Sequence, residues 1–171
     1  MRYAPIVLLL TACGYNNSAN ESPLIVAARS GNAARVTQLL KQGADPNQRT
    51  GGNDWPVLMH AVHKNQLATA AALLDAGADP NRGYPHNYTP LMMAAGYGHA
   101  DMVKLLLARG ANPRAADDRG ATALDYARDG TNDIDRFTIF SCQDETARLL
   151  LAADPAQPRG RSWWAKVKRC A

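Results

Sequence analysis

A five-residue phrase recurs along the chain at a nearly constant interval. Gly-Ala-Asp-Pro-Asn occupies residues 43–47 and again 77–81, and a near copy, Gly-Ala-Asn-Pro-Arg, occupies 110–114. The copies therefore begin 34 and then 33 residues apart. A unit of this length is typical of a stacked solenoid, in which one unit cannot bury its apolar face alone. Such chains usually present an extended surface to a partner, which argues against most classes of enzyme.

Each phrase marks the end of a predicted helix. Apolar residues precede it on one helical face, as Val103, Leu106 and Leu107 do before the third copy. The first residue of each phrase is a glycine, which adopts the left-handed conformation that ends a helix without a Cβ penalty. The proline of the phrase cannot continue the helix. These glycines are Gly43, Gly77 and Gly110.

A shorter helix is predicted to precede the longer one in every unit. Its start is clearest at Thr89-Pro90-Leu91, because threonine is a good N-cap and proline is favoured at the first helical position. Equivalent starts follow Ser22, Pro56 and Thr122. The leucines that mark these starts are spaced 34, 33 and 33 residues apart, and they are Leu24, Leu58, Leu91 and Leu124. The sequence thus predicts four helix–turn–helix units.

Residues 89–99, Thr-Pro-Leu-Met-Met-Ala-Ala-Gly-Tyr-Gly-His, resemble the central motif of the ankyrin-repeat family, with Met92 where a histidine is usual. The resemblance covers roughly residues 22–153. It implies an all-α fold, a solenoid of about four helix–turn–helix units joined by short β-turn hairpins. The second unit departs from the family pattern at Val57, Val62 and Asn65, of which Asn65 is a mild change because asparagine tolerates the left-handed conformation.

The fourth unit departs most from the pattern. An insertion at 131–141 separates its first helix from its second. Thr122 and Asp125 are placed to form a partial capping box. Terminal repeats of a solenoid are often atypical because they close the open end of the stack, so this unit is predicted to be an irregular C-terminal cap. The alternative is that the insertion is a binding loop.

The N-terminal segment predicts a bacterial lipoprotein. Residues 1–12 hold one positive charge, a short apolar run and then small residues, which is typical of a signal peptide; a membrane span needs about 20 apolar residues. Leu10-Thr11-Ala12-Cys13 is similar to the lipobox, which implies that Cys13 becomes the lipidated first mature residue. Residues 13–21 then form a polar tether. The alternative is a buried N-terminal segment with a chance cysteine.

The lipobox resemblance implies a location on the periplasmic side of a bacterial membrane. Each buried acyl CH₂ contributes about 0.8 kcal/mol, and more than one chain gives stable anchoring. Gly14 follows the cysteine where aspartate often retains lipoproteins in the inner membrane, so the outer membrane is favoured. A cytosolic ankyrin adaptor is the alternative, and it requires the lipobox match to be accidental.

The positive charge of the chain is concentrated in its C-terminal tail, residues 154–171. The formal net charge is +4, yet the part after Pro155 holds no acid and these bases: Arg159, Arg161, Lys166, Lys168 and Arg169. The repeats themselves are net negative, and we expect no nucleic-acid partner. Trp163 and Trp164 are predicted to help the tail cap the last unit; contact with a membrane or partner is the alternative.

Two cysteines remain when Cys13 is lipidated. Because the periplasm is oxidising, Cys142 and Cys170 form a candidate disulfide pair. A bridge between them would fasten the tail to the fourth unit and stabilise the fold by about 3 kcal/mol in the chain-entropy model.

No motif of a catalytic site is recognisable, so neither an enzymatic activity nor a cofactor is predicted. His60 and His63 share a helical face but lack a third metal ligand nearby, and His99 is expected to be structural. A rival hypothesis is an enzyme whose site lies in residues 131–145. Its candidate groups would be Asp133, Asp135 and Cys142.

The binding surface of ankyrin-like stacks comprises the hairpin tips and the exposed side of each first helix. Trp55 and Tyr88 each precede a first helix, so we expect them to be neighbours on this concave face. Aromatic and arginine side chains are the usual interface anchors; the alternative is that both rings only brace the hairpins. The predicted partner-binding residues are Arg49, Asn53, Trp55, His63, Lys64, Tyr84, His86, Tyr88, Tyr97 and Arg119.

The resemblance to periplasmic repeat lipoproteins implies a protein partner. One implied role is that of an immunity protein, which neutralises a secreted effector in the periplasm, such as a lipase of the type VI secretion system. The other is that of a scaffold or stress-protection factor.

Overall fold

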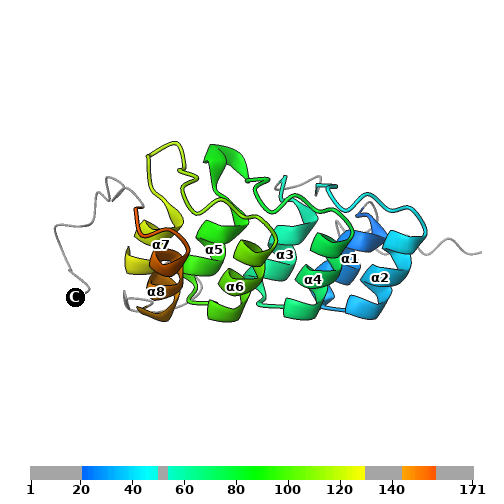
Figure 1. Cartoon of the computed structure of the whole chain (residues 1–171). Coiled ribbons are helices and arrows are strands. Elements are labelled where there is room, and N and C mark those ends of the chain that lie inside the picture. The colour runs from blue at the N-terminus through cyan, green and yellow to red at the C-terminus, as the bar shows by residue number, and fades with distance from the viewer. Residues whose placement is uncertain (1–20, 50–53, 130–143, 157–171) are drawn as a thin grey trace, which may run out of the picture.

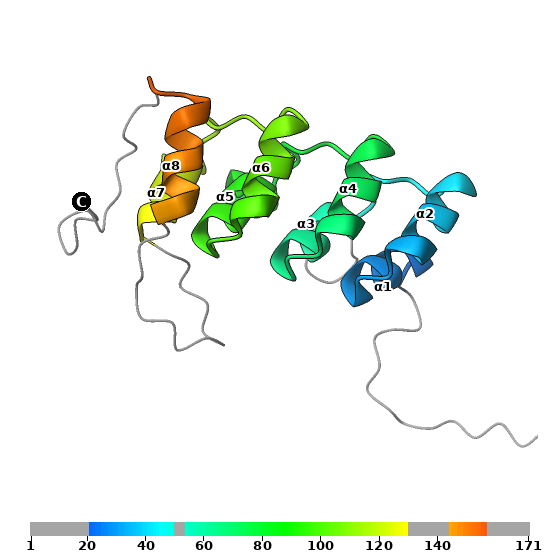
Figure 2. The same ribbon diagram turned by 60° about the horizontal axis from the view of Figure 1, so that its bottom comes forward.

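A computed structural model describes residues 21–49, 54–129 and 144–156. These residues form helix pairs stacked in one row (Figures 1 and 2). The pairs are α1 (Pro23–Ser30) with α2 (Ala33–Lys41), α3 (Val57–His63) with α4 (Leu67–Asp75), α5 (Pro90–Gly96) with α6 (Ala100–Ala108), and α7 (Ala123–Asp129) with α8 (Asp144–Ala153). The predicted all-α solenoid of four units is confirmed, and each first helix begins where the sequence places it.

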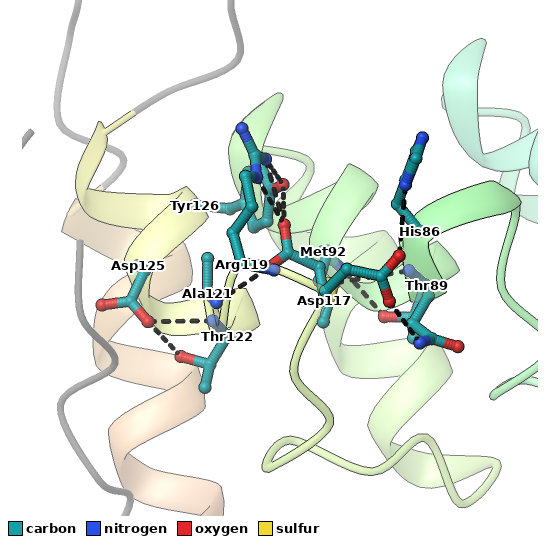
Figure 3. Close-up of polar contacts among 11 residues, drawn as sticks. His86, Thr89, Met92, Asp117, Arg119, Ala121, Thr122, Asp125 and Tyr126 are labelled. Carbon is teal, nitrogen blue, oxygen red and sulfur yellow. Dashed lines mark hydrogen bonds and ion pairs between the residues drawn. The ribbon is translucent and has the colours of Figure 1, made fainter. Parts of the chain in front are cut away.

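The predicted caps explain two of these starts. At α5 the Thr89 hydroxyl accepts from the Met92 N–H at 3.3 Å, while the Thr89 N–H donates to the Met92 sulfur at 3.4 Å. A methionine thus occupies the place that glutamate takes in a capping box. At α7 only half of the box forms, because both the N–H and the hydroxyl of Thr122 donate to one Asp125 oxygen, each at 2.8 Å (Figure 3).

The second helices end at the repeated phrase as expected. The φ of Gly110 is 86°, and its N–H donates to the Leu107 carbonyl, while the next N–H donates to Leu106. This pair of bonds satisfies carbonyls that the helix end leaves open. Asn65, at the turn between the helices of the second unit, has a φ of 53° and so adopts the left-handed conformation that the sequence predicts.

The core runs the length of the stack between the two rows of helices. The marker leucines are fully buried, and each first helix places small or β-branched residues against its neighbours, for example Ala94 and Ala95 in α5. Small side chains let consecutive pairs approach closely, so α3 packs between α1 and α5, and α5 packs against α7. The core is therefore thin and shared between neighbouring units.

The asparagine that ends the repeated phrase bridges one unit to the next. Asn47 donates to the Gly77 carbonyl at 3.0 Å and accepts from the Asp79 N–H at 2.8 Å. Asn81 repeats the arrangement, with the Gly110 carbonyl at 3.0 Å and the Asn112 N–H at 2.7 Å. The phrase is thus both a helix stop and a bond between units.

Three antiparallel bridges close short hairpins between the units: Arg49–Pro56, Tyr84–Tyr88 and Ala116–Thr122. The second hairpin carries a 3-10 turn, η2 (Pro85–Asn87), and together with the third it projects from one side of the helix row, at the top of Figure 1. No helix in the described part of the chain is long and apolar enough to cross a bilayer.

Several predictions fall outside the described residues and stay predictions. They concern the signal segment 1–12 with Cys13, the insertion at 131–141 and the neighbouring Cys142, and the tail beyond 156 with Cys170. Asn53, a predicted binding residue, also lies outside.

Candidate functional site

Six aromatic and imidazole rings form a continuous band that runs from the first two hairpins along α3 to the turn between α5 and α6. We call this set the ring band; it consists of Tyr84, Trp55, His60, His63, Tyr97 and His99. The Trp55 ring lies 5.9 Å from Tyr84, 5.2 Å from His60 and 5.4 Å from His63, measured between centroids. The band continues through Tyr97, whose ring centroid lies 5.4 Å from that of His63 and 5.5 Å from that of His99.

Two consecutive units contribute to the ring band. Trp55 ends the first hairpin, and His60 and His63 lie three apart on α3, which places both on one helical face. Tyr84 comes from the second hairpin, and Tyr97 and His99 flank the turn between α5 and α6. Residues of the third unit, Tyr84 and Tyr97, therefore meet Trp55 and His63 of the second unit, although the residues that meet do not hold equivalent positions in the repeat.

The rings of the band pack beside the core, and all of them except His60 are partly exposed to solvent. Trp55, Tyr84 and Tyr97 are half-buried and pack against the buried cluster. Most neighbouring pairs meet edge to face, for example Trp55 and Tyr84 at 77°, a favourable geometry for aromatic rings. Side chains held in this way lose little freedom when a partner binds.

His60 is the buried member of the band. Only 6% of the His60 residue is exposed, and its Nε2 has no hydrogen-bond partner among the described residues. Burial, together with the charges of Arg29 and His63, lowers the pKa of His60 from 6.5 to about 4, while the charge of Glu21 acts in the opposite direction. His60 is therefore a neutral imidazole at neutral pH.

The hairpin tips are tied to their neighbours. Arg49 donates to the carboxylate of Asp54 at 2.6 Å within its own hairpin and to the Gly83 carbonyl of the next hairpin at 3.2 Å. His86 Nδ1 lies 3.1 Å from Asp118 of the third hairpin, whose N–H donates to the His86 carbonyl at 3.0 Å. These bonds link the described parts of the three hairpins to one another before any partner binds.

A second cluster lies at the C-terminal end of the same side (Figure 3). Tyr88 and Tyr126 meet with ring centroids 5.0 Å apart, and the Arg119 guanidinium lies 6.0 Å from the Tyr126 centroid. Arg119 donates to Asp117 at 3.1 Å and also to the Tyr126 hydroxyl, which in turn donates to Asp117 at 2.8 Å. Arg119 is thus held in place by its own unit.

Burial and hydrogen bonds set the protonation states of this cluster. Burial acts to raise the pKa of Asp117, but bonds from Ala121, Tyr126 and Arg119 outweigh it and the pKa lies below its ordinary value. Burial, together with the bond to Asp117, raises the pKa of Tyr126 to about 12. Asp117 is therefore charged and Tyr126 neutral over the physiological range.

The structure brings together only part of the predicted binding set. Trp55, His63, Tyr84 and Tyr97 lie in the ring band, whereas Tyr88 and Arg119 lie in the second cluster. Arg49 and His86 hold the hairpins, and Lys64 is exposed at the end of α3. Trp55 and Tyr88, which were expected to be neighbours, make their ring contacts with different residues.

Sequence reasoning did not include His60, His99 or Tyr126 in the binding surface. A signal for two of them exists: His60 and Tyr126 both stand two positions after a marker leucine, on the same face of their helices. In the described part of the chain, no group of three histidine, cysteine or acidic residues is arranged to hold a metal ion.

Comparison with known proteins places the repeats. A family model described as ankyrin repeats in three copies matches residues 2–84, and a second, described as ankyrin repeats in many copies, matches residues 73–127. The chain is 58% identical over 40 residues to the E3 ubiquitin-protein ligase hecd-1 of Caenorhabditis elegans. That match covers 23% of this chain and only 2% of the ligase.

Proposed function

The chain belongs to the ankyrin-repeat family, whose members are generally protein–protein interaction modules, and from this premise we propose a specific setting for it. The protein is lipid-anchored at Cys13 on the periplasmic side of a bacterial membrane, with the outer membrane favoured. Its ring band binds a secreted effector that reaches the periplasm, such as a lipase of the type VI secretion system, and neutralises it.

The observation that supports binding through this surface is the ring band itself. Tryptophan and tyrosine are the side chains that most often anchor interfaces, because they bury much area and lose little conformational freedom. Trp55 contacts three other rings of the band, Tyr84, His60 and His63. Val26, 47% exposed, stands two residues after its marker leucine as His60 does, so it extends the apolar surface onto α1.

The support for the anchor is the sequence Leu10-Thr11-Ala12-Cys13. The match of one ankyrin model begins at residue 2, so the same segment also has some likeness to a repeat. Metabolic labelling with an alkyne analogue of palmitate separates the two possibilities. We expect label on the wild type and on Cys170→Ala, and none on Cys13→Ala. An unlabelled wild-type protein would contradict the anchor.

The partner is sought first in the product of the neighbouring gene. A secreted lipase or other toxin there fits the immunity role, whereas a catalase fits stress protection. We expect Trp55→Ala to weaken binding by about 1 kcal/mol or more while the protein stays folded. Leu67→Ala, at an exposed leucine that begins α4, is the matched control and should bind as the wild type does.

Neutralisation is measured separately from binding. An equimolar amount of the protein should abolish the activity of the purified effector, and Trp55→Ala should restore it. Binding without loss of activity would favour the scaffold role. A Trp55→Ala protein that is unfolded by circular dichroism would instead show that Trp55 belongs to the core.

A further inference from the structure

One position on the inner helices carries a different kind of side chain in each unit. The residue two places after the marker leucine is Val26, His60, Met93 and Tyr126 in turn. Val26 is exposed, whereas His60 and Met93 are buried, with 6% and 3% of each residue exposed. The second unit therefore buries an ionisable imidazole where the third unit buries a thioether.

The surroundings of His60 suit only its neutral form. The ring packs against Trp55 at 5.2 Å, and the buried Nε2 finds no hydrogen-bond partner among the described residues. Arg29 of α1 and His63 of α3 both disfavour a positive charge on His60. Glu21 favours such a charge, but its carboxylate is already paired with Arg29 at 2.8 Å. Trp55 and His63 in turn contact the rings of Tyr84 and Tyr97.

A proton on His60 would put a second cation next to Arg29 in a largely desolvated site. Such a charge is costly unless it reaches water or an anion. Helix α3 is anchored by fully buried residues on both sides of His60, such as Met59 and Ala61. Trp55 is half-buried and precedes the helix, so its ring can move without displacing the buried residues that hold α3.

We propose that His60 is an acid-sensitive element of the binding surface: its protonation displaces Trp55 and disrupts the ring band while the helix stack stays folded. The consequence for partner binding rests on the proposed function, but the movement of Trp55 does not. The surface is thus assembled at neutral pH and released in acid.

The direction of the pH dependence follows from the two protonation equilibria. In the folded protein the pKa of His60 is about 4, whereas in the unfolded chain it takes its ordinary value of 6.5. Well above pH 6.5 His60 is neutral in both the folded and the unfolded chain, so its protonation does not affect the free energy of unfolding. As the pH falls from 6.5 towards 4 the unfolded or displaced state gains the proton first, and the buried arrangement loses stability.

The test follows Trp55 fluorescence in a Trp163→Phe, Trp164→Phe background, where Trp55 is the remaining tryptophan. We expect an emission shift between pH 6.5 and 4, with unchanged helical circular dichroism. His60→Met, which installs the residue of the third unit, should abolish the shift. His63→Gln, a control at the neighbouring histidine, should retain it. His60→Gln replaces His60→Met if the latter does not fold.

Several results would overturn the proposal. They are a shift that persists without His60, a shift that disappears in His63→Gln, or a Trp55 signal that stays constant until the helices melt. Titration of the His60 ring by NMR gives an independent check, and an ordinary pKa there would also contradict it. A different result would contradict the proposed function, namely that Trp55→Ala leaves binding to the neighbouring gene product unchanged. That result does not depend on how Trp55 responds to pH.

Discussion

Arg114 binds both carboxylate oxygens of Asp154, a residue 40 positions further along the chain, with its Nη2 2.9 Å from Oδ1 and its Nε on Oδ2. Arg114 ends the third copy of the repeated phrase, where Asn47 and Asn81 end the first two. Asp154 belongs to a remnant of the phrase, Ala-Ala-Asp-Pro at residues 152–155. A side-chain ion pair therefore continues, after the last helix, the bridge that asparagine makes between earlier units.

Arg114→Asn gives the third phrase the residue of the other two but removes this ion pair. We expect a small drop in melting temperature and faster hydrogen exchange in α8, both vanishing at high salt because the pair is at the surface. The hydrogen bond from Arg114 holds the pKa of Asp154 below its ordinary value, so the stabilisation is lost as the pH falls through that pKa. Arg35→Asn, at an exposed arginine away from this contact, is the control; equal effects would contradict the prediction.

Asn81→Ala removes both bonds between the second and third phrases. We expect a loss of about 1–2 kcal/mol in the free energy of unfolding, measured in urea, because two backbone groups lose their partners. Asn81→Asp keeps the oxygen that accepts from the Asn112 N–H and loses the donor to the Gly110 carbonyl, so it should lie between wild type and Asn81→Ala. An alanine variant as stable as the wild type would show that water replaces the bridge.

Gly31 and Gly110 both have a positive φ, 74° and 86°, but different surroundings. A Cβ at Gly110 would meet nothing within 4 Å, so Gly110→Ala should cost only the conformational term of about 1–2 kcal/mol. A Cβ at Gly31 would lie 2.7 Å from the Gln66 side chain, which donates to the Arg29 carbonyl. Gly31→Ala should therefore lower the free energy of unfolding more than Gly110→Ala does. Combining Gly31→Ala with Gln66→Ala should remove this extra loss relative to Gln66→Ala alone, and thermal unfolding of these variants checks it.

Asp117→Asn tests the second cluster. The Asp117 side chain is 2% exposed and accepts from the Ala121 and Arg119 N–H groups, the Arg119 guanidinium and the Tyr126 hydroxyl. We expect a loss of about 1.5–3 kcal/mol at neutral pH. Because the folded pKa is lowered, this contribution disappears as the pH falls through it, so wild type and variant should converge in acid.

Asp118→Asn is the matched control for that substitution. Asp118 is half-exposed and bonds His86 and Asn87 at the surface, so its replacement should cost clearly less. If Asp118→Asn proves as destabilising as Asp117→Asn, the buried carboxylate is not what holds the third hairpin.

The sequence by itself determined the helices, their order and the number of units. The signals are local: Thr89-Pro90 starts a helix, Gly110 ends one, and Asn65 adopts a positive φ, each for reasons contained in a few consecutive residues. The partial capping box at Thr122 shows the limit of such reasoning. Both the N–H and the hydroxyl of Thr122 donate to one oxygen of the buried Asp125 carboxylate, and the sequence does not specify that choice.

Only the tertiary structure decided which side chains meet. Trp55 and Tyr88 hold equivalent positions in the sequence, yet Trp55 covers His60 of its own unit while Tyr88 meets Tyr126 of the next. Contacts between units depend on the size of the residues at several equivalent positions at once, which the repeat length does not specify. The periodicity therefore fixes the stack, and the packing of adjacent units fixes the surface that it presents.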